Sequence, residues 1–282
     1  MTRLSFRRTV ALCARQELML ALRSRWTQIF AVVFAALALG VAFSGYILSG
    51  GRGVQDFART AASLVQLVLL LVPLTALLLG VLSLTPGPGA AELLYSQPVA
   101  RPAVLVGRTA GLLLALVAAE FIGFGASGLV IYANAGPEGL TGFFAVVAAS
   151  VVLTAVCLGL AALISSDAGS HRRARALAFA LVAWVVLVLA FDLAALGLAS
   201  MLRSGTASRL LIVASLANPI DAIQTGALLA IEGTAAFGPA SLALIRFSGS
   251  GARTGVLIGL SLAVWLVVPL VVASWRLARA DI

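Results

Sequence analysis

The sequence predicts an all-α integral membrane protein with six transmembrane helices. Of its 282 residues, 62% are hydrophobic and only 10% are charged, a composition typical of membrane proteins. Six apolar stretches of 20 to 23 residues are each long enough to cross about 30 Å of hydrocarbon as a helix. They are Ile29–Leu48, Ala62–Leu84, Thr109–Ile131, Phe143–Ile164, Leu177–Ala199 and Gly255–Trp275. We therefore expect one membrane domain over residues 1–282, without a separate soluble domain.

The placement of arginine predicts the orientation. All 19 basic residues are arginines, and 13 of them lie at the span ends that also carry the two termini. Because positive charge accumulates on the inner side, we expect both termini in the cytoplasm and the protein in a bacterial inner membrane. Trp26 and Trp275 flank the first and last spans on that side. The net charge of +9 forms no continuous face, so we expect contact with lipid and no nucleic-acid partner.

Residues 1–27 are expected to form an amphipathic helix on the inner membrane surface. Its apolar side carries Phe6, Val10, Cys13 and Leu20, and its charged side carries Arg7, Arg8, Arg15 and Arg25. Glu17 departs from the pattern because it falls on the apolar side. The segment is either a positive patch that sets the topology or an elbow helix that braces the first span, and both interpretations stay open.

The cytoplasmic connection after the second span, residues 85–104, is expected to contain a short helix. A Pro-Gly-Pro-Gly sequence at residues 86–89 must break the preceding helix. Ala90–Ser96 can then form about two turns before Pro98 stops them. A short helix that projects toward the cytosol can receive motion from a soluble partner.

The outer segment, residues 200–254, is too long for a simple turn. Asn218 is a suitable N-cap, Pro219 suits the first helical position, and Asp221 complements the dipole of the first turn. A helix is expected from Pro219 to about Ile231, and a second from Pro239 to about Phe247. Both are apolar but too short to span, so we expect re-entrant or interfacial helices.

Two ionisable residues lie inside the six apolar stretches. Glu120 is at the middle of the third, where a charge costs up to about 2.5–3.5 kcal/mol, so its side chain must face protein or a water-filled cavity. It makes either a packing hydrogen bond or a hinge, relay or substrate contact. Asp192 lies nearer the outer end of the fifth stretch and is expected to be structural.

Catalysis is not expected of this chain. Gly125-Ala126-Ser127-Gly128 fits the motif of an intramembrane serine protease, but that chemistry needs a histidine near the serine. The only histidine, His171, is predicted about a membrane thickness away. The small residues are better explained by close helix packing.

Neither a metal site nor a nucleotide site is expected. The metal-ligating side chains Cys13, Met19, Cys157, His171 and Met201 are scattered along the chain. The usual phosphate-binding loop needs a lysine, and the sequence has none. If ATP drives this protein, a separate polypeptide must therefore bind the ATP and Mg²⁺ and hydrolyse the nucleotide, and this chain carries no cofactor.

The order of these segments resembles that of ABC-2 type transporter permeases. The similarity lies in Gln16–Leu18 with Arg23–Trp26, in Glu92–Arg101 and in Val104–Arg108. Ala100 and Arg108 stand where the family more often has serine and lysine. The resemblance implies a homodimer of this chain that works with two cytoplasmic ABC ATPase subunits. It also implies which residues contact the ATPase: Glu92, Leu93, Leu94, Tyr95, Ser96, Gln97, Pro98 and Arg101.

Within that family, residues 218–222 and 238–240 resemble the permeases of the system that matures nitrous-oxide reductase. This narrower resemblance implies a periplasmic copper-handling partner on the outer segment. The residues expected to contact it are Asn218, Pro219, Asp221, Glu232 and Pro239. The alternatives are an exporter of a drug, lipid or polysaccharide and, in a different class, a passive membrane anchor.

Overall fold

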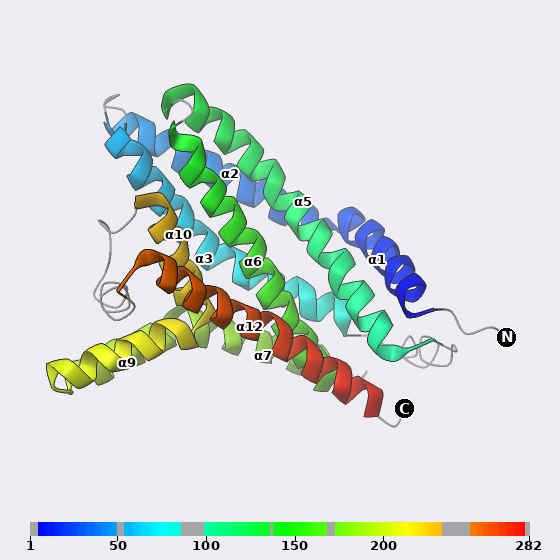
Figure 1. The fold of residues 1–282 in the computed structure, drawn as a ribbon. Coiled ribbons are helices and arrows are strands. Elements are labelled where there is room, and N and C mark those ends of the chain that lie inside the picture. Colours follow the sequence, from blue (N-terminus) through cyan, green and yellow to red (C-terminus); the bar gives the residue numbers. More distant parts are fainter. Residues whose placement is uncertain are drawn as a thin grey trace.

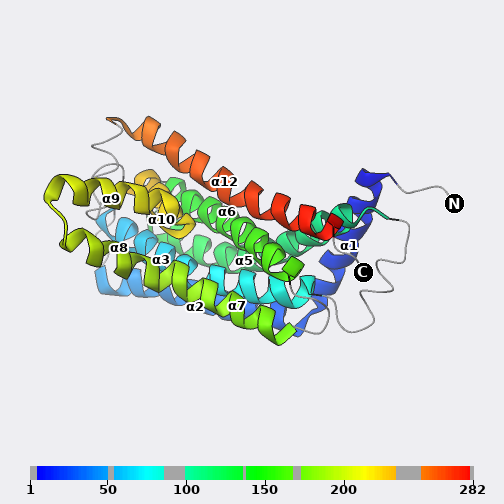
Figure 2. The same cartoon turned by 90° about the horizontal axis from the view of Figure 1, so that it is seen from below.

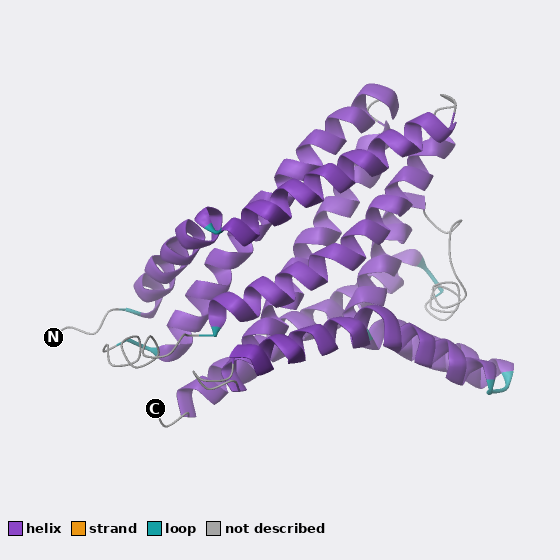
Figure 3. Cartoon of the chain, turned by 180° about the vertical axis from the view of Figure 1, so that it is seen from behind, coloured by secondary structure: helices purple, strands orange, loops and turns teal. Residues whose placement is uncertain are grey.

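A computed structural model describes residues 5–49, 54–85, 99–135, 138–167, 173–232 and 249–279, and every regular element within them is a helix. The long helices form an elongated bundle (Figures 1 and 3). Both chain termini lie at the same end of this bundle (Figure 1). We refer to that end as the terminal end and to the other as the distal end.

Six helical spans in the described part of the chain are long and apolar enough to cross a membrane. They are α2 (Arg25–Ser49), α3 (Val54–Leu84), α5 (Arg101–Ala135), α6 (Glu138–Asp167), the continuous α7–η1–α8 unit (Arg173–Val185, Val186–Ala190 and Phe191–Ser200) and α12 (Gly251–Arg279). Each of the six predicted stretches lies within one of these spans. The predicted all-α fold with six transmembrane helices is confirmed.

Three spans form the core and three surround it. In the most apolar window of α3, of α5 and of α6, 50% of the residues are buried, against 22% in α2, 11% in α7–α8 and 17% in α12. Phe124 of α5 links the core to its surroundings, with edge-on ring contacts at 5.1 Å to Phe34 and 5.9 Å to Phe143. Figure 2 shows α12 on the opposite side of the bundle from α2 and α7. These outer spans leave wide apolar faces for lipid or for another protein.

The first helix is shorter than the single helix predicted over residues 1–27. Helix α1 (Phe6–Arg23) ends at Ser24, whose backbone is extended, and α2 begins at Arg25. Helix α1 packs against α5 beside the terminal end of the bundle (Figure 1). Glu17 is 7% exposed, so this carboxylate on the apolar side of α1 is covered by protein.

The distal segment contains one helix that the sequence does not predict. Helix α9 (Ser204–Ala217) precedes α10 (Pro219–Glu232), and the two meet at a bend of 96°. The start of α10 at Pro219 agrees with the prediction. Helix α10 packs against α6, α12 and α3. The second predicted helix, Pro239–Phe247, lies outside the described residues.

Candidate functional site

The two flanks of the predicted coupling segment are attached to the bundle. The expected helix Ala90–Ser96 and the predicted contact residues from Glu92 to Pro98 lie outside the described residues. On the first flank, the Thr85 hydroxyl donates to Ser165 Oγ of α6 at 3.3 Å. On the second, Arg101 Nη1 donates to the Leu277 carbonyl of α12 at 3.5 Å. The two flanks are therefore bonded to different helices, α6 and α12.

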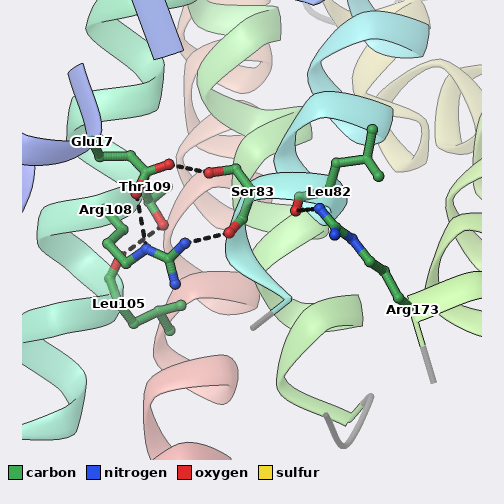
Figure 4. A network of polar contacts seen from close by, with 7 residues as sticks. All are labelled: Glu17, Leu82, Ser83, Leu105, Arg108, Thr109 and Arg173. Atoms are coloured by element: carbon green, nitrogen blue, oxygen red, sulfur yellow. Dashed lines mark hydrogen bonds and ion pairs between the residues drawn. The ribbon is translucent and has the colours of Figure 1, made fainter. Parts of the chain in front are cut away.

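An ion pair joins α1 to α5 beside these flanks (Figure 4). Arg108 Nε lies 2.9 Å from Glu17 Oε2, and their side chains are 21% and 9% exposed. The Ser83 hydroxyl donates to the other carboxylate oxygen of Glu17, and Arg108 Nη2 donates to the Ser83 carbonyl. One carboxylate and one guanidinium thus connect three helices, α1, α3 and α5. Charge-assisted bonds of this kind are stronger than neutral ones, particularly where water is largely excluded.

Close packing of α1 on α5 brings these charges together. A Cβ atom on Gly111 would lie 2.2 Å from the Ala14 carbonyl oxygen, and one on Gly107 would lie 2.7 Å from the Val10 carbonyl oxygen. The two glycines are four residues apart, on one face of α5, as in other close helix pairs in membranes. Burial in this contact raises the pKa of the Cys13 thiol, and the nearby Arg108 cation opposes that shift.

Two arginines bind the carbonyl end of α3. Arg108 donates to the Ser83 carbonyl, and Arg173 Nη2, from the start of α7, donates to the Leu82 carbonyl at 2.5 Å (Figure 4). The last carbonyls of a helix lack intrahelical donors and carry partial negative charge, so cations are favourable there. We call Glu17, Ser83, Arg108 and Arg173 the terminal network. It attaches α1, α5 and α7 to α3, two residues before the coupling segment begins.

The terminal network is not predicted from the sequence. Arg108 stands out there only through the family resemblance, and no contact is predicted for Arg173. One signal was present: Glu17 stood on the apolar side of an amphipathic helix, where an ionised group needs a partner. The identity of that partner depends on the packing of α1 on α5, which no pattern in residues 1–27 encodes.

Glu120 links the two core helices α5 and α6. Its carboxylate is 1% exposed and accepts hydrogen bonds from Ser150 Oγ at 2.7 Å and Thr154 Oγ1 at 2.6 Å. Both donors come from α6, one turn apart. This geometry matches the packing hydrogen bond that was one of the two predicted roles of Glu120.

Asn218 holds the bend between α9 and α10. Its Oδ1 accepts from the Ile220 N–H at 3.1 Å, the N-cap bond that the sequence predicted. Its amide nitrogen donates to the Leu187 carbonyl at 2.8 Å. Leu187 lies in η1, a π-helical turn in the middle of the fifth span. Such turns alter the regular bonding of a helix and are frequent at functional sites.

The other polar groups at the bend are also paired. Ser261 and Trp265 of α12 donate to the carbonyls of Leu216 and Ala217, at 2.5 and 3.1 Å. These carbonyls end α9, so α12 satisfies backbone groups that a broken helix at membrane depth would otherwise leave unpaired. The Asp221 carboxyl group lies near Asp192 and Asn218.

The predicted distal contact residues are thus only partly brought together. Asn218, Pro219 and Asp221 share the first turn of α10, and Asp192, predicted separately, joins them. Glu232 is the last residue of α10, at its other end. Pro239 lies outside the described residues.

Ser127 shows the environment of a packing residue. Its hydroxyl is fully buried and donates to the Gly123 carbonyl, one turn earlier in the same helix, at 3.0 Å. A nucleophilic serine would instead be bonded to a base and reachable by substrate. His171 lies outside the described residues.

A sequence model of the ABC-2 family transporter proteins matches residues 11–282. The chain belongs to the ABC-2 transporter family. It is 35% identical over 237 residues to the probable ABC transporter permease protein NosY of Pseudomonas aeruginosa, which covers 82% of this chain and 85% of that protein. The protein of the same name from Stutzerimonas stutzeri is 32% identical over 252 residues, covering 86% and 84%. As an ABC-2 permease, the chain is an integral membrane subunit of an ABC transporter.

Proposed function

We propose that this ABC-2 permease couples ATP hydrolysis by two separate cytoplasmic ABC ATPase subunits to a periplasmic copper-handling partner. The partner would serve the maturation of nitrous-oxide reductase, and two copies of this chain would form the membrane part. Similarity to two proteins named NosY supports this system, together with the resemblance of residues 218–222 and 238–240. In the proposed orientation the terminal end lies in the cytoplasm and the distal end in the periplasm.

The attachment of the coupling segment is the observation that carries the proposal. Its flanks are bonded to α6 through Ser165 and to α12 through Leu277. The same two helices pack against α10 at the distal end. Because packed helices shift as rigid bodies, a displacement of the coupling segment by the ATPase can reach α10 through them. The terminal network adds α1, α5 and α7 to the moving unit.

The proposed output is movement, not the passage of bare copper. Copper prefers thiolate, thioether and imidazole ligands, and the few such residues of this chain are scattered in the sequence. We therefore expect sealed vesicles that contain the permease and its ATPase to show no ATP-dependent copper flux through the permease. Such a flux would contradict this part of the proposal.

The coupling role can be tested with Arg101→Ala and Glu92→Ala in the assembled complex. Both should leave membrane insertion and ATP hydrolysis intact while abolishing the ATP-dependent change in distance between spin labels on α10 of the two protomers. The matched control is Arg279→Ala, because Arg279 also lies at the terminal end but its guanidinium is 4.1 Å from the Trp275 ring centre. Variants that fail to fold, or an unchanged distal response, would refute the role of the segment.

A further inference from the structure

An apolar groove opens between α2, α3 and α7 in the half of the bundle nearer the terminal end. Its volume is about 300 Å³, at the lower limit of about 300–1,000 Å³ that is usual for ligand pockets. Three lining residues of α2 are well exposed, Trp26 at 65%, Ile29 at 52% and Val33 at 42%, so the groove faces outward, toward the bilayer. The remaining lining residues are Phe30, Leu71, Leu74, Thr75, Leu78, Leu79, Leu82 and Leu177.

The lining suits hydrocarbon. Thr75 is the only hydroxyl-bearing residue in it, and this hydroxyl donates to the Leu71 carbonyl of its own helix at 2.8 Å. Trp26 is the second residue of α2, so it stands at the mouth of the groove, where an indole N–H suits the headgroup region. A polar solute would find no free partner along the groove, whereas an acyl chain from the bilayer exchanges one apolar environment for another and loses no polar contact.

Two arginines stand at the mouth of the groove. Arg25 precedes Ile29 by four residues in α2, and Arg173 precedes Leu177 by four in α7, so each lies on the lining face one turn nearer the terminal end. Both are exposed. The position of Arg173 is fixed by its 2.5 Å bond to the carbonyl of Leu82, itself a lining residue. A guanidinium has five N–H donors, so this bond leaves others for a phosphate.

The helices that line the groove bring only positive charge to its mouth. Residues 25–49, 70–85 and 173–190, which form this corner of the bundle, include no aspartate or glutamate. Helices α2 and α7 both begin here, and the positive ends of their dipoles add to the attraction for an anion. The corner therefore combines an apolar groove with a cationic rim.

We propose that this groove binds one acyl chain of an anionic phospholipid, with the phosphate headgroup held by Arg25 and Arg173. The orientation in the proposed function places this lipid in the cytoplasmic leaflet. Only this choice of leaflet rests on the proposed function. A second copy of this chain fits the mouth less well, because most of its arginines lie at the same end and would bring like charge to the rim.

Quenching of Trp26 by brominated lipid tests the proposal. The full-length chain is reconstituted in phosphatidylcholine vesicles that contain a small fraction of dibrominated phosphatidylglycerol or, separately, of dibrominated phosphatidylcholine. The difference between the wild-type protein and Trp26→Phe isolates the signal of Trp26. We expect brominated phosphatidylglycerol to quench Trp26 at a much lower mole fraction, because each arginine at the rim favours the anionic lipid about fivefold.

Variants of the rim identify the headgroup contact. Arg173→Gln and Arg25→Gln should each lower the preference for phosphatidylglycerol about fivefold, and Arg173→Lys should retain most of it. Arg175→Gln is the matched control: Arg175 is also exposed on α7, but its guanidinium lies over Phe179, 5.2 Å from the ring centre. The Arg25 variant keeps the test valid if loss of the Arg173–Leu82 bond prevents folding.

Three results would overturn the proposal. The first is equal quenching of Trp26 by both lipids, and the second is an equal loss of preference in Arg175→Gln. The third is the absence of quenching by either lipid, which would mean that protein covers the groove. Because the assay needs neither ATP nor an ATPase nor copper, its failure is distinguishable from failure of the proposed function.

Discussion

At the scale of single residues, the Glu17–Arg108 pair allows a quantitative test of the terminal network. Arg108→Gln leaves a nearly buried carboxylate with one hydroxyl donor, so we expect it to lower the free energy of unfolding by about 2–3 kcal/mol. Glu17→Gln should cost less, about 1–2 kcal/mol, because Arg108 is the more exposed partner and keeps its bond to the Ser83 carbonyl. Denaturant titration in detergent micelles measures both losses.

The double variant Glu17→Gln, Arg108→Gln provides the control for that pair. Its two neutral amides can hydrogen-bond with each other and leave no unpaired charge, so its loss should be smaller than the sum of the single losses by at least about 1 kcal/mol. Simple additivity would mean that the two side chains do not interact in the folded protein.

Glu120 yields a second residue-scale prediction. Glu120→Ala removes the acceptor for two buried hydroxyls and leaves a cavity, so we expect it to lower the free energy of unfolding by about 2–4 kcal/mol. Glu120→Gln preserves the shape and an acceptor oxygen, and should cost less than about 1 kcal/mol. Ser127→Ala, the control, loses only a bond to its own helix and should behave like Glu120→Gln.

Activity then separates the two roles left open for Glu120. A packing role predicts that Glu120→Gln supports full ATP-driven function in the assembled complex. If this variant is stable but inactive, the carboxylate acts as a proton relay or a substrate contact instead.

Individual residues were predictable where the signal was local. The bond from Asn218 to the Ile220 N–H needs only the order of neighbouring residues, and burial of Glu120 follows from its place in an apolar stretch. The terminal network was not predictable, because Glu17, Ser83 and Arg108 are distant in the sequence and meet only after α1 has packed on α5. The same holds for the bond from Asn218 to Leu187.

At the scale of helices, the contact between α1 and α5 depends on glycine. In Gly111→Ala the new methyl group would meet the Ala14 backbone at 2.2 Å, so α1 must move away from α5. We expect a stability loss of about 1–3 kcal/mol and a weaker disulfide cross-link between cysteines placed on α1 and α5. Gly125→Ala, on the same helix, has no atom within 4 Å of the added carbon. It should be neutral or stabilising by up to about 1 kcal/mol, and an equal loss in both variants would exclude the close contact as the cause.

The helices themselves divide into those the sequence predicts and those it does not. Hydropathy identifies all six spans, because each is long and nearly free of charge. Helix α9 lacks such a hydropathy signal, because it has only 14 residues and begins directly after an arginine. Asn218 at its C-terminal end is its only sequence boundary signal. The π-helical turn η1 lies in an uninterrupted run of valine, leucine and alanine, and the carbonyl that it offers to Asn218 depends on the position of α10.

At the scale of the whole molecule, the two ends of the bundle have different structures. At the terminal end, Arg101, Arg108 and Arg173 bond neighbouring helices to one another. The distal end contains a broken helix pair whose bend is held by neutral hydrogen bonds from Asn218, Ser261 and Trp265. Arginines that bond helices together suit a surface that transmits force from a soluble partner. A broken helix suits a part of the molecule that changes position.

The path of α9 and α10 determines the topology of the whole chain. If this pair enters and leaves the membrane on the distal side, the chain crosses six times and both termini lie on one side. If the bent pair counted as a further crossing, the total would be seven and the termini would lie on opposite sides. The packing of α10 back along α6 and α12 favours re-entry.

A fluorescent-protein fusion, which matures only in the cytoplasm, and an alkaline phosphatase fusion, which is active only in the periplasm, distinguish these cases. We expect N- and C-terminal fusions to fluoresce, phosphatase fused after Met201 to be active, and a cysteine at Arg253 to react with an impermeant maleimide from outside. An active phosphatase at the C-terminus with a fluorescent N-terminal fusion would establish seven crossings. An active phosphatase at the C-terminus with a non-fluorescent N-terminal fusion would place both termini outside and reverse the proposed direction of coupling.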